Sequence, residues 1–256
     1  MAIVFTKERL DLLASYVMEG YISELASHCD TSFPHLRVKM GSQNLYQALR
    51  RSVEKAKNIG FTQKDTVQFY IDLQITFGWE FDNDPQYSWL NKILIENQDT
   101  EQIEKSTILY DEVETYLIKL WGNDRHALSN QINHMAQLNI KALNNKNVYT
   151  PQEMLSILEE IYPKKFAITS KQSIENLVQF SKIKDESNHY QFVPIVPMFL
   201  LGSGYKEDPF LSWMKTSDTY LSIENESIPL ESTSSDSLYC YLEQSDHLFS
   251  ENRRKG

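Results

Sequence analysis

Apolar residues recur at intervals of three and four along most of this chain, which is the spacing of helices with one buried face. In the first such segment, Leu10, Leu13, Val17, Tyr21 and Leu25 are expected to form one apolar stripe. The same reasoning predicts helices over residues 7–28, 44–60, 63–78, 86–97, 100–121, 124–143, 153–162 and 173–184. The pattern therefore indicates an all-α protein.

Residues at the ends of these segments support the same fold class. Glycine and proline are scarce, at eight each, which argues against a β-sandwich or barrel with many turns. Thr6 is placed to cap the first helix, and Thr150 begins a capping box that ends at Glu153. In residues 189–202, Pro194 and Pro197 interrupt a strongly apolar run. A kinked helix and an extended buried segment both fit that run.

Charge narrows the range of partners. The 256 residues carry 35 acidic and 25 basic side chains, a formal net charge of −10. An acidic chain repels phosphate, so neither nucleic acid nor an anionic membrane is an expected partner. No run reaches the ~18 apolar residues of a spanning helix, and the charged N-terminal segment does not resemble a signal peptide. We expect a cytoplasmic protein with Cys29 and Cys240 as reduced thiols.

One short pattern occurs twice. The string GWEFDNDPQYSW begins at Gly78, and GSGYKEDPFLSW begins at Gly202. The two strings share a glycine, an aromatic residue, Asp-Pro, serine and tryptophan at matching positions. This repeat motif comprises Gly78, Phe81, Asp84, Pro85 and Trp89 in the first copy, and Gly202, Tyr205, Asp208, Pro209 and Trp213 in the second. The recurrence predicts an internal duplication.

The residue types in the motif point to a structural role. A glycine after an apolar run ends a helix, and the aromatic residue three positions later can pack back on it. Asp84 and Asp208 each precede a proline, the arrangement of an N-cap followed by proline at the first helical position. Trp89 and Trp213 are then expected to be mostly buried core anchors.

The repeat also predicts how the chain is organised. Residues 1–121 would form an N-terminal helical half and residues 150–216 a related C-terminal half, joined through 122–149. Residues 217–256 read as a polar, acidic and serine-rich tail. Its few large apolar residues are candidates for partner binding: Tyr239, Tyr241, Leu242, Leu248 and Phe249.

Candidate chemistry is sparse. The sequence contains no phosphate-binding glycine loop, nucleophile elbow, CxxC or HExxH motif. Asp82 and Asp84 could suggest a calcium loop, but Tyr87 occupies the position that needs glycine. His126 and His134 are two helical turns apart, too far to share a metal by themselves. We therefore expect no catalytic residue, metal or cofactor, and a protein that is not an enzyme.

The first half resembles a family of small helical proteins encoded beside spike, adaptor and effector genes of bacterial type VI secretion systems. The resemblance covers about residues 1–120. It depends on a helix ending in glycine, an aliphatic helix, and then G-x-x-F-D-x-D-P followed by tryptophan. The matching residues are Gly60, Ile71, Leu73, Gly78, Phe81, Asp82, Asp84, Pro85 and Trp89. The second half departs from the pattern, since Lys206 replaces the first aspartate.

This resemblance implies a non-catalytic accessory that binds an effector or adaptor and helps to load it on the secretion spike. The alternative that it implies is an immunity protein that blocks a cognate toxin. In both cases the partner is another protein.

Overall fold

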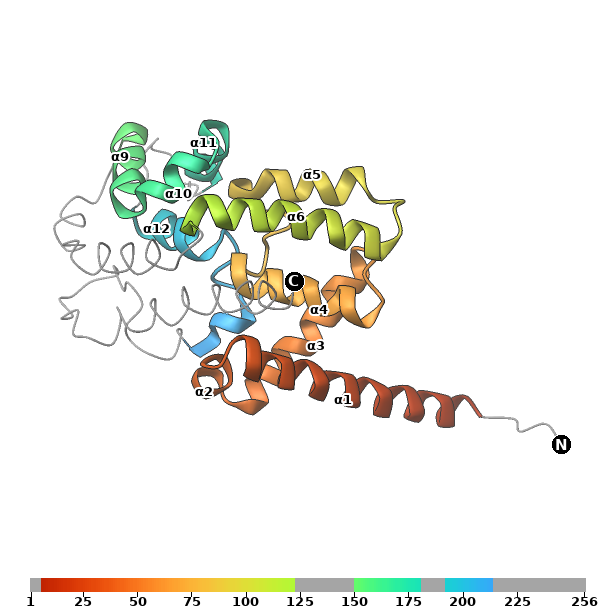
Figure 1. Cartoon of the computed structure of the whole chain (residues 1–256). Coiled ribbons are helices and arrows are strands. Elements are labelled where there is room, and N and C mark those ends of the chain that lie inside the picture. Colours follow the sequence, from red (N-terminus) through yellow and green to blue (C-terminus); the bar gives the residue numbers. More distant parts are fainter. Residues whose placement is uncertain (1–5, 123–149, 181–191, 214–256) are drawn as a thin grey trace.

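The computed structural model describes residues 6–122, 150–180 and 192–213, and every regular element in these ranges is helical (Figure 1). The protein is all-α, as the apolar spacing predicted. The first part contains α1 (Lys7–Ser32), α2 (Leu36–Met40), α3 (Ser42–Asn58), α4 (Lys64–Phe77), the 3-10 helix η1 (Pro85–Tyr87), α5 (Ser88–Glu96) and α6 (Gln102–Trp121). The second contains α9 (Pro151–Ile161), α10 (Pro163–Ile168), α11 (Lys171–Phe180), α12 (Phe192–Leu201) and the 3-10 helix η2 (Pro209–Leu211).

The caps expected at Thr6 and Thr150 are confirmed. The Thr6 side chain accepts a hydrogen bond from the Arg9 amide at the start of α1. Thr150 and Glu153 form the reciprocal capping box at the start of α9. In the ambiguous segment, α12 is a helix that contains Pro197, so the extended alternative is wrong. Ile195, Val196, Met198 and Phe199 of α12 are buried.

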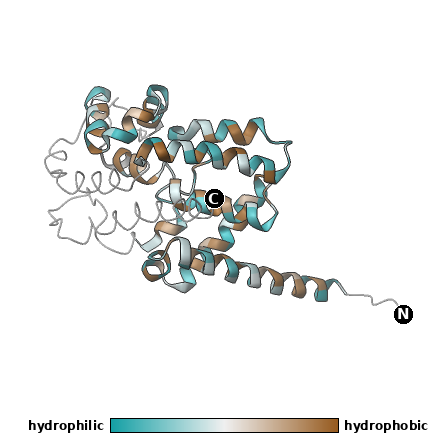
Figure 2. Ribbon diagram, in the orientation of Figure 1, coloured by the Kyte–Doolittle hydropathy of each residue, from teal (hydrophilic) through white to brown (hydrophobic). Residues whose placement is uncertain are grey.

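Helix α4 lies at the centre of the core. Every residue from Tyr70 to Phe77 is buried, including the polar Asp72, Gln74 and Thr76. Helix α3 packs on one part of α4, and α6 on another. The colouring of α4 in Figure 2 is mixed because polar residues of this helix are buried together with apolar ones.

A hydrogen bond between His28 and the buried Asp72 joins α1 to this central helix. His28 Nε2 lies 2.8 Å from Asp72 Oδ1. Burial raises the pKa of the Asp72 carboxyl, and the nearby His28 partly offsets that effect. Because an unpaired buried charge is costly, the pair fixes how α1 sits on α4.

The buried residues of both sequence halves form one continuous hydrophobic cluster. Trp121 at the end of α6 donates from its indole nitrogen to the Tyr162 hydroxyl after α9, at 3.2 Å. The expected connecting helix within 122–149 and the tail from 217, with its five candidate partner-binding residues, lie outside the described residues. None of the helices in the described ranges is long and apolar enough to cross a membrane.

The single apolar stripe expected in α1 is wrong. Ile22, Leu25, Ala26 and Cys29 are buried, whereas the apolar residues of the first half are exposed. That half extends away from the body of the molecule toward the N-terminus (Figure 1). The exposed residues are Leu10, Leu12, Leu13, Tyr16 and Val17. The two halves of α1 therefore present apolar residues to different surroundings.

Candidate functional site

The two copies of the repeat motif meet directly. Gly78 and Gly202 have φ angles of 102° and 96°, a backbone region that favours glycine. A Cβ atom added to Gly78 would lie 2.5 Å from the carbonyl oxygen of Leu201, and one added to Gly202 would lie 2.7 Å from that of Phe77. Both glycines are therefore needed for backbone conformation and for the close approach of two chain segments.

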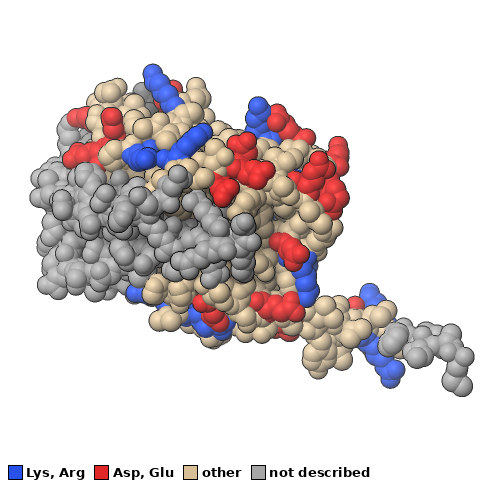
Figure 3. Space-filling model, in the orientation of Figure 1, with Lys and Arg blue, Asp and Glu red and all other residues tan. Residues whose placement is uncertain are grey.

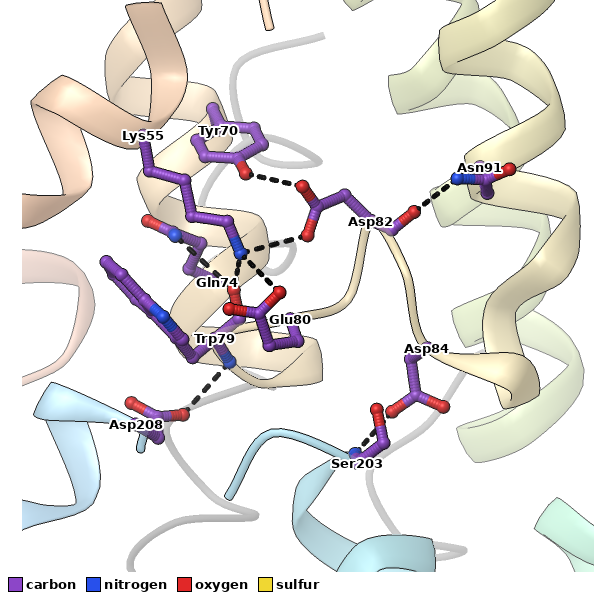
Figure 4. Close-up of polar contacts among 10 residues, drawn as sticks. All are labelled: Lys55, Tyr70, Gln74, Trp79, Glu80, Asp82, Asp84, Asn91, Ser203 and Asp208. Atoms are coloured by element: carbon purple, nitrogen blue, oxygen red, sulfur yellow. Dashed lines mark hydrogen bonds and ion pairs between the residues drawn. The ribbon is translucent and has the colours of Figure 1, made fainter. Parts of the chain in front are cut away.

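Hydrogen bonds cross between the copies in a reciprocal manner (Figure 4). The amide of Trp79 donates to Asp208 Oδ2 at 3.0 Å. The amide of Ser203 donates to Asp84 Oδ2 at 2.6 Å. Trp79 and Ser203 each follow the motif glycine, so each copy gives the other the same backbone donor.

The second oxygen of each aspartate caps its own short helix. Asp84 Oδ1 accepts from the Gln86 amide at 2.8 Å, and Asp208 Oδ1 accepts from the Phe210 amide at 2.8 Å. Pro85 and Pro209 occupy the first helical position, as the sequence predicted. The capping role was therefore predicted correctly. Nothing in the sequence indicated that hydrogen bonds join the two copies.

Burial removes water from these two carboxyl groups, so they need hydrogen-bond donors from the protein. Asp84 and Asp208 each expose only 1% of their surface. Burial raises the pKa of Asp84, while the amides of Ser203 and Gln86 and the charge of Lys165 act in the opposite direction. Oriented amide donors replace the lost water, so the motif can hold an aspartate in the core.

Lys165 on α10 is a core residue that sequence reasoning missed. Its amino group donates to the Tyr87 hydroxyl at 2.9 Å and to the carbonyl of Phe199. It also lies over the rings of both residues. Burial lowers its pKa from 10.5 to about 8, and the charge of Asp84 partly offsets this. Only its contacts with Tyr87 in η1 and Phe199 in α12 distinguish Lys165 from its neighbour Lys164, which is exposed.

A second polar network surrounds the first copy. Lys55 donates to the carbonyl of Trp79 at 2.6 Å and to Asp82 Oδ1 at 3.0 Å, and pairs with Glu80 at 3.1 Å. Tyr70 donates to Asp82 Oδ2 at 3.2 Å (Figure 4). Lys206 takes the place of Asp82 in the second copy, so the same arrangement cannot form there.

This network opens onto a surface hollow. The ring of Trp79 forms part of its wall, with the Arg51 guanidinium 5.2 Å and the Lys55 amino group 5.0 Å from the ring centre. The lining residues are Arg50, Arg51, Glu54, Lys55, Asn58, Trp79 and Glu80. We refer to these residues as the Trp79 hollow. Within the described ranges, no three His, Cys, Asp or Glu side chains gather as a metal site would require.

The expectation of two buried tryptophans at the end of the motif needs correction. Trp89 and Trp213 are only partly buried, at the edge of the core. The ring of Trp89 lies 5.4 Å from that of Tyr116, and Lys39 lies over the ring of Trp213. Other large side chains in and beside the two copies are buried instead of these tryptophans, and they include Leu90 directly after Trp89. They also include Phe81, Tyr87, Tyr205, Phe210 and Leu211.

No protein-family model matches this chain, and neither the curated proteins nor the solved structures contain a significant match.

Replacing either motif glycine by alanine should destabilise the protein more than the same change at Gly41. Gly41 has a similar positive φ of 76°, but a Cβ there meets nothing within 4 Å. Backbone strain costs about 1–3 kcal/mol at all three sites. Gly78→Ala and Gly202→Ala add a steric overlap of about 1–3 kcal/mol. Urea denaturation measures the difference, and equal losses at Gly41 and Gly78 would contradict the close approach.

Phe81→Ala should cost about 3–5 kcal/mol of unfolding free energy, because the ring is fully buried. Trp89→Ala should cost clearly less, since its side chain is partly in solvent. Thermal and urea unfolding of the two variants compare them directly. A larger loss at Trp89 would restore the original view of the motif.

Lys165→Met should change how stability depends on pH. The folded-state pKa of about 8 lies below the ordinary 10.5, so the unfolded chain binds more protons between these values. Unfolding free energy of the wild type therefore gains up to about 3 kcal/mol from this residue as the pH rises from 8 to 10.5. The variant lacks that gain. Parallel profiles in urea denaturation from pH 7 to 10.5 would show that Lys165 is not desolvated.

Proposed function

We propose that this chain is a non-catalytic, protein-binding accessory of a bacterial type VI secretion system, of the kind that helps to load an effector. The resemblance of the first half to such accessories gives the system. The Trp79 hollow is the observation that carries the binding role. Tryptophan and arginine are the residue types most enriched where protein interfaces gain their energy.

The motif itself supports a structural role over a catalytic one. Both oxygens of Asp84 and both of Asp208 accept backbone amides. The amino group of Lys55 is committed to three oxygen partners. A general acid or base must reach a substrate, and these buried groups are directed at one another.

The hollow suits an acidic segment of a partner protein. The guanidinium group of Arg51 can bind a carboxylate of a partner in a bidentate manner. Arg50 is already paired with Glu19, and the ring of Trp79, only 7% exposed, lies beneath Arg51 and Lys55 and supports their position.

Acidic side chains gather over α5 and α6 (Figure 3). The exposed ones there are Glu96, Asp99, Glu101, Glu104, Asp111 and Glu112. Glu54 and Glu80 also line the hollow, so the exposed Arg51 is the cation there that we expect to meet a carboxylate of the partner.

We also propose that the scaffold arose by internal duplication. The order α1, α2, α3, α4, η1 corresponds to α9, α10, α11, α12, η2. Helix α3 contacts η2, and α11 contacts η1, so the correspondence extends to reciprocal packing. The residues that end α1 and α9, Phe33 and Tyr162, share nearly the same backbone angles, −136°/65° and −141°/75°. The difference between Asp82 and Lys206 then leaves the hollow on one copy.

Deletion of the gene should separate the loading role from the immunity role. Loss of a loading accessory should abolish export of an effector while sibling cells leave the mutant unharmed. Loss of an immunity protein should make the mutant sensitive to its siblings. A paired secretion and competition assay distinguishes these outcomes, and sensitivity with normal export would overturn the accessory proposal.

Arg51→Glu should prevent complementation of the export defect without affecting folding, because Arg51 is exposed and its charge faces the hollow. Lys92→Glu on α5 makes the same charge change at an exposed site outside the hollow, so it should restore export fully. Melting temperatures of both variants should match the wild type. Full complementation by Arg51→Glu would remove the hollow from the proposal.

A further inference from the structure

One exposed face of α1 carries large side chains in its first half and small side chains in its second half. Leu13, Tyr16, Gly20, Ser23 and Ser27 follow one another at alternating spacings of three and four, so they share one face of the helix. All five are exposed. We call this row the outer face. Its first half carries large side chains and its second half carries small ones.

The outer face points away from the core. Ile22, Leu25, Ala26 and Cys29 are the buried residues of α1, and they lie on roughly the opposite side of the helix. Leu13 is 55% exposed and Tyr16 is 69% exposed, with Leu10, Leu12 and Val17 beside them similarly exposed. Together these side chains expose on the order of 500 Å², near the upper end of apolar patches on monomeric proteins.

Gly20 is an independent indication that another helix packs on this face. It stands in the middle of α1, where glycine weakens a helix relative to alanine. A Cβ atom placed there meets nothing within 4 Å, so packing within the described residues does not require glycine. A glycine on an exposed apolar face allows the backbone of another helix to approach closely.

We propose that α1 is a dimerisation helix, and that two copies of this chain pair their outer faces in antiparallel orientation. In this orientation Gly20 meets Gly20 of the second copy at the crossing point. Leu13 then faces Ser27 of the second copy, and Tyr16 lies at a height between its Ser23 and Ser27. The large half of each outer face therefore lies on the small half of the other, whereas parallel pairing would place large on large and small on small.

The charge of Arg9 and the placement of the two bodies are both compatible with a second copy of this chain on the outer face. Arg9 lies on the outer face one turn before Leu13, so pairing brings it to the C-terminal end of the other α1, where the helix dipole is negative. Because the outer face is opposite the core face, the two bodies lie on opposite sides of the helix pair. The apolar and small-residue surfaces of both copies would bury about 1,200 Å², the lower limit of stable interfaces.

Sedimentation velocity of the full chain from about 1 to 100 µM should show a dimer, since micromolar affinity is typical of an interface this small. Gly20→Leu should weaken association at least tenfold, because the added side chain blocks the close approach. The monomer should have at least the wild-type helicity, since the added side chain enters open space and leucine favours a helix more than glycine does. Ser15→Leu adds the same group at an exposed α1 position off the outer face and should leave association unchanged.

Engineered cysteines test the orientation. With Cys240 replaced by serine, Gly20→Cys should cross-link two copies under mild oxidation. A mixture of Leu13→Cys and Ser27→Cys chains should cross-link to each other, whereas Leu13→Cys alone should not. A wild type that stays monomeric, a Gly20→Leu protein that dimerises as tightly, or efficient cross-linking of Leu13→Cys to itself would each overturn the proposal.

Discussion

Two hydrogen bonds between the motif copies are the constraint on which the rest of the fold depends. The Ser203 amide donates to Asp84, and the Trp79 amide donates to Asp208. Each carboxylate caps its own turn with one oxygen and binds the other copy with the second. The contact requires Gly78 and Gly202, because any side chain would enter the opposing backbone. Elements more than a hundred residues apart are thereby joined at one point in the core.

Unequal surroundings of the two aspartates explain where a surface for partners can form. Near the first copy, Asp82, Tyr70 and Lys55 form a network beneath the Trp79 hollow, where Arg51 is exposed above the buried ring of Trp79. Lys206 prevents the same network in the second copy. On the other side, Lys165 supplies a positive charge to Asp84 from within the core. The Trp79 hollow therefore lies beside the first copy of the motif.

Helix α1 is packed against the core along its second half and extends into solvent along its first half. Its second half is fixed to α4 through the pair of His28 and Asp72. Its first half extends beyond the body with apolar residues in solvent. Because the core face and the outer face are on opposite sides, the whole helix has little net amphipathicity even though each half is patterned. The apolar pattern of α1 taken as a whole therefore shows neither face.

The sequence by itself determined what depends on neighbouring residues: helical class, the caps at Thr6 and Thr150, and the Asp-Pro turns. These follow from local backbone sterics and short-range hydrogen bonds. Tertiary structure alone decided that the two motifs bind each other, that Lys165 is buried, and that Trp89 stays at the edge of the core. Those outcomes depend on contacts between distant segments, for which spacing along one chain carries no physical signal.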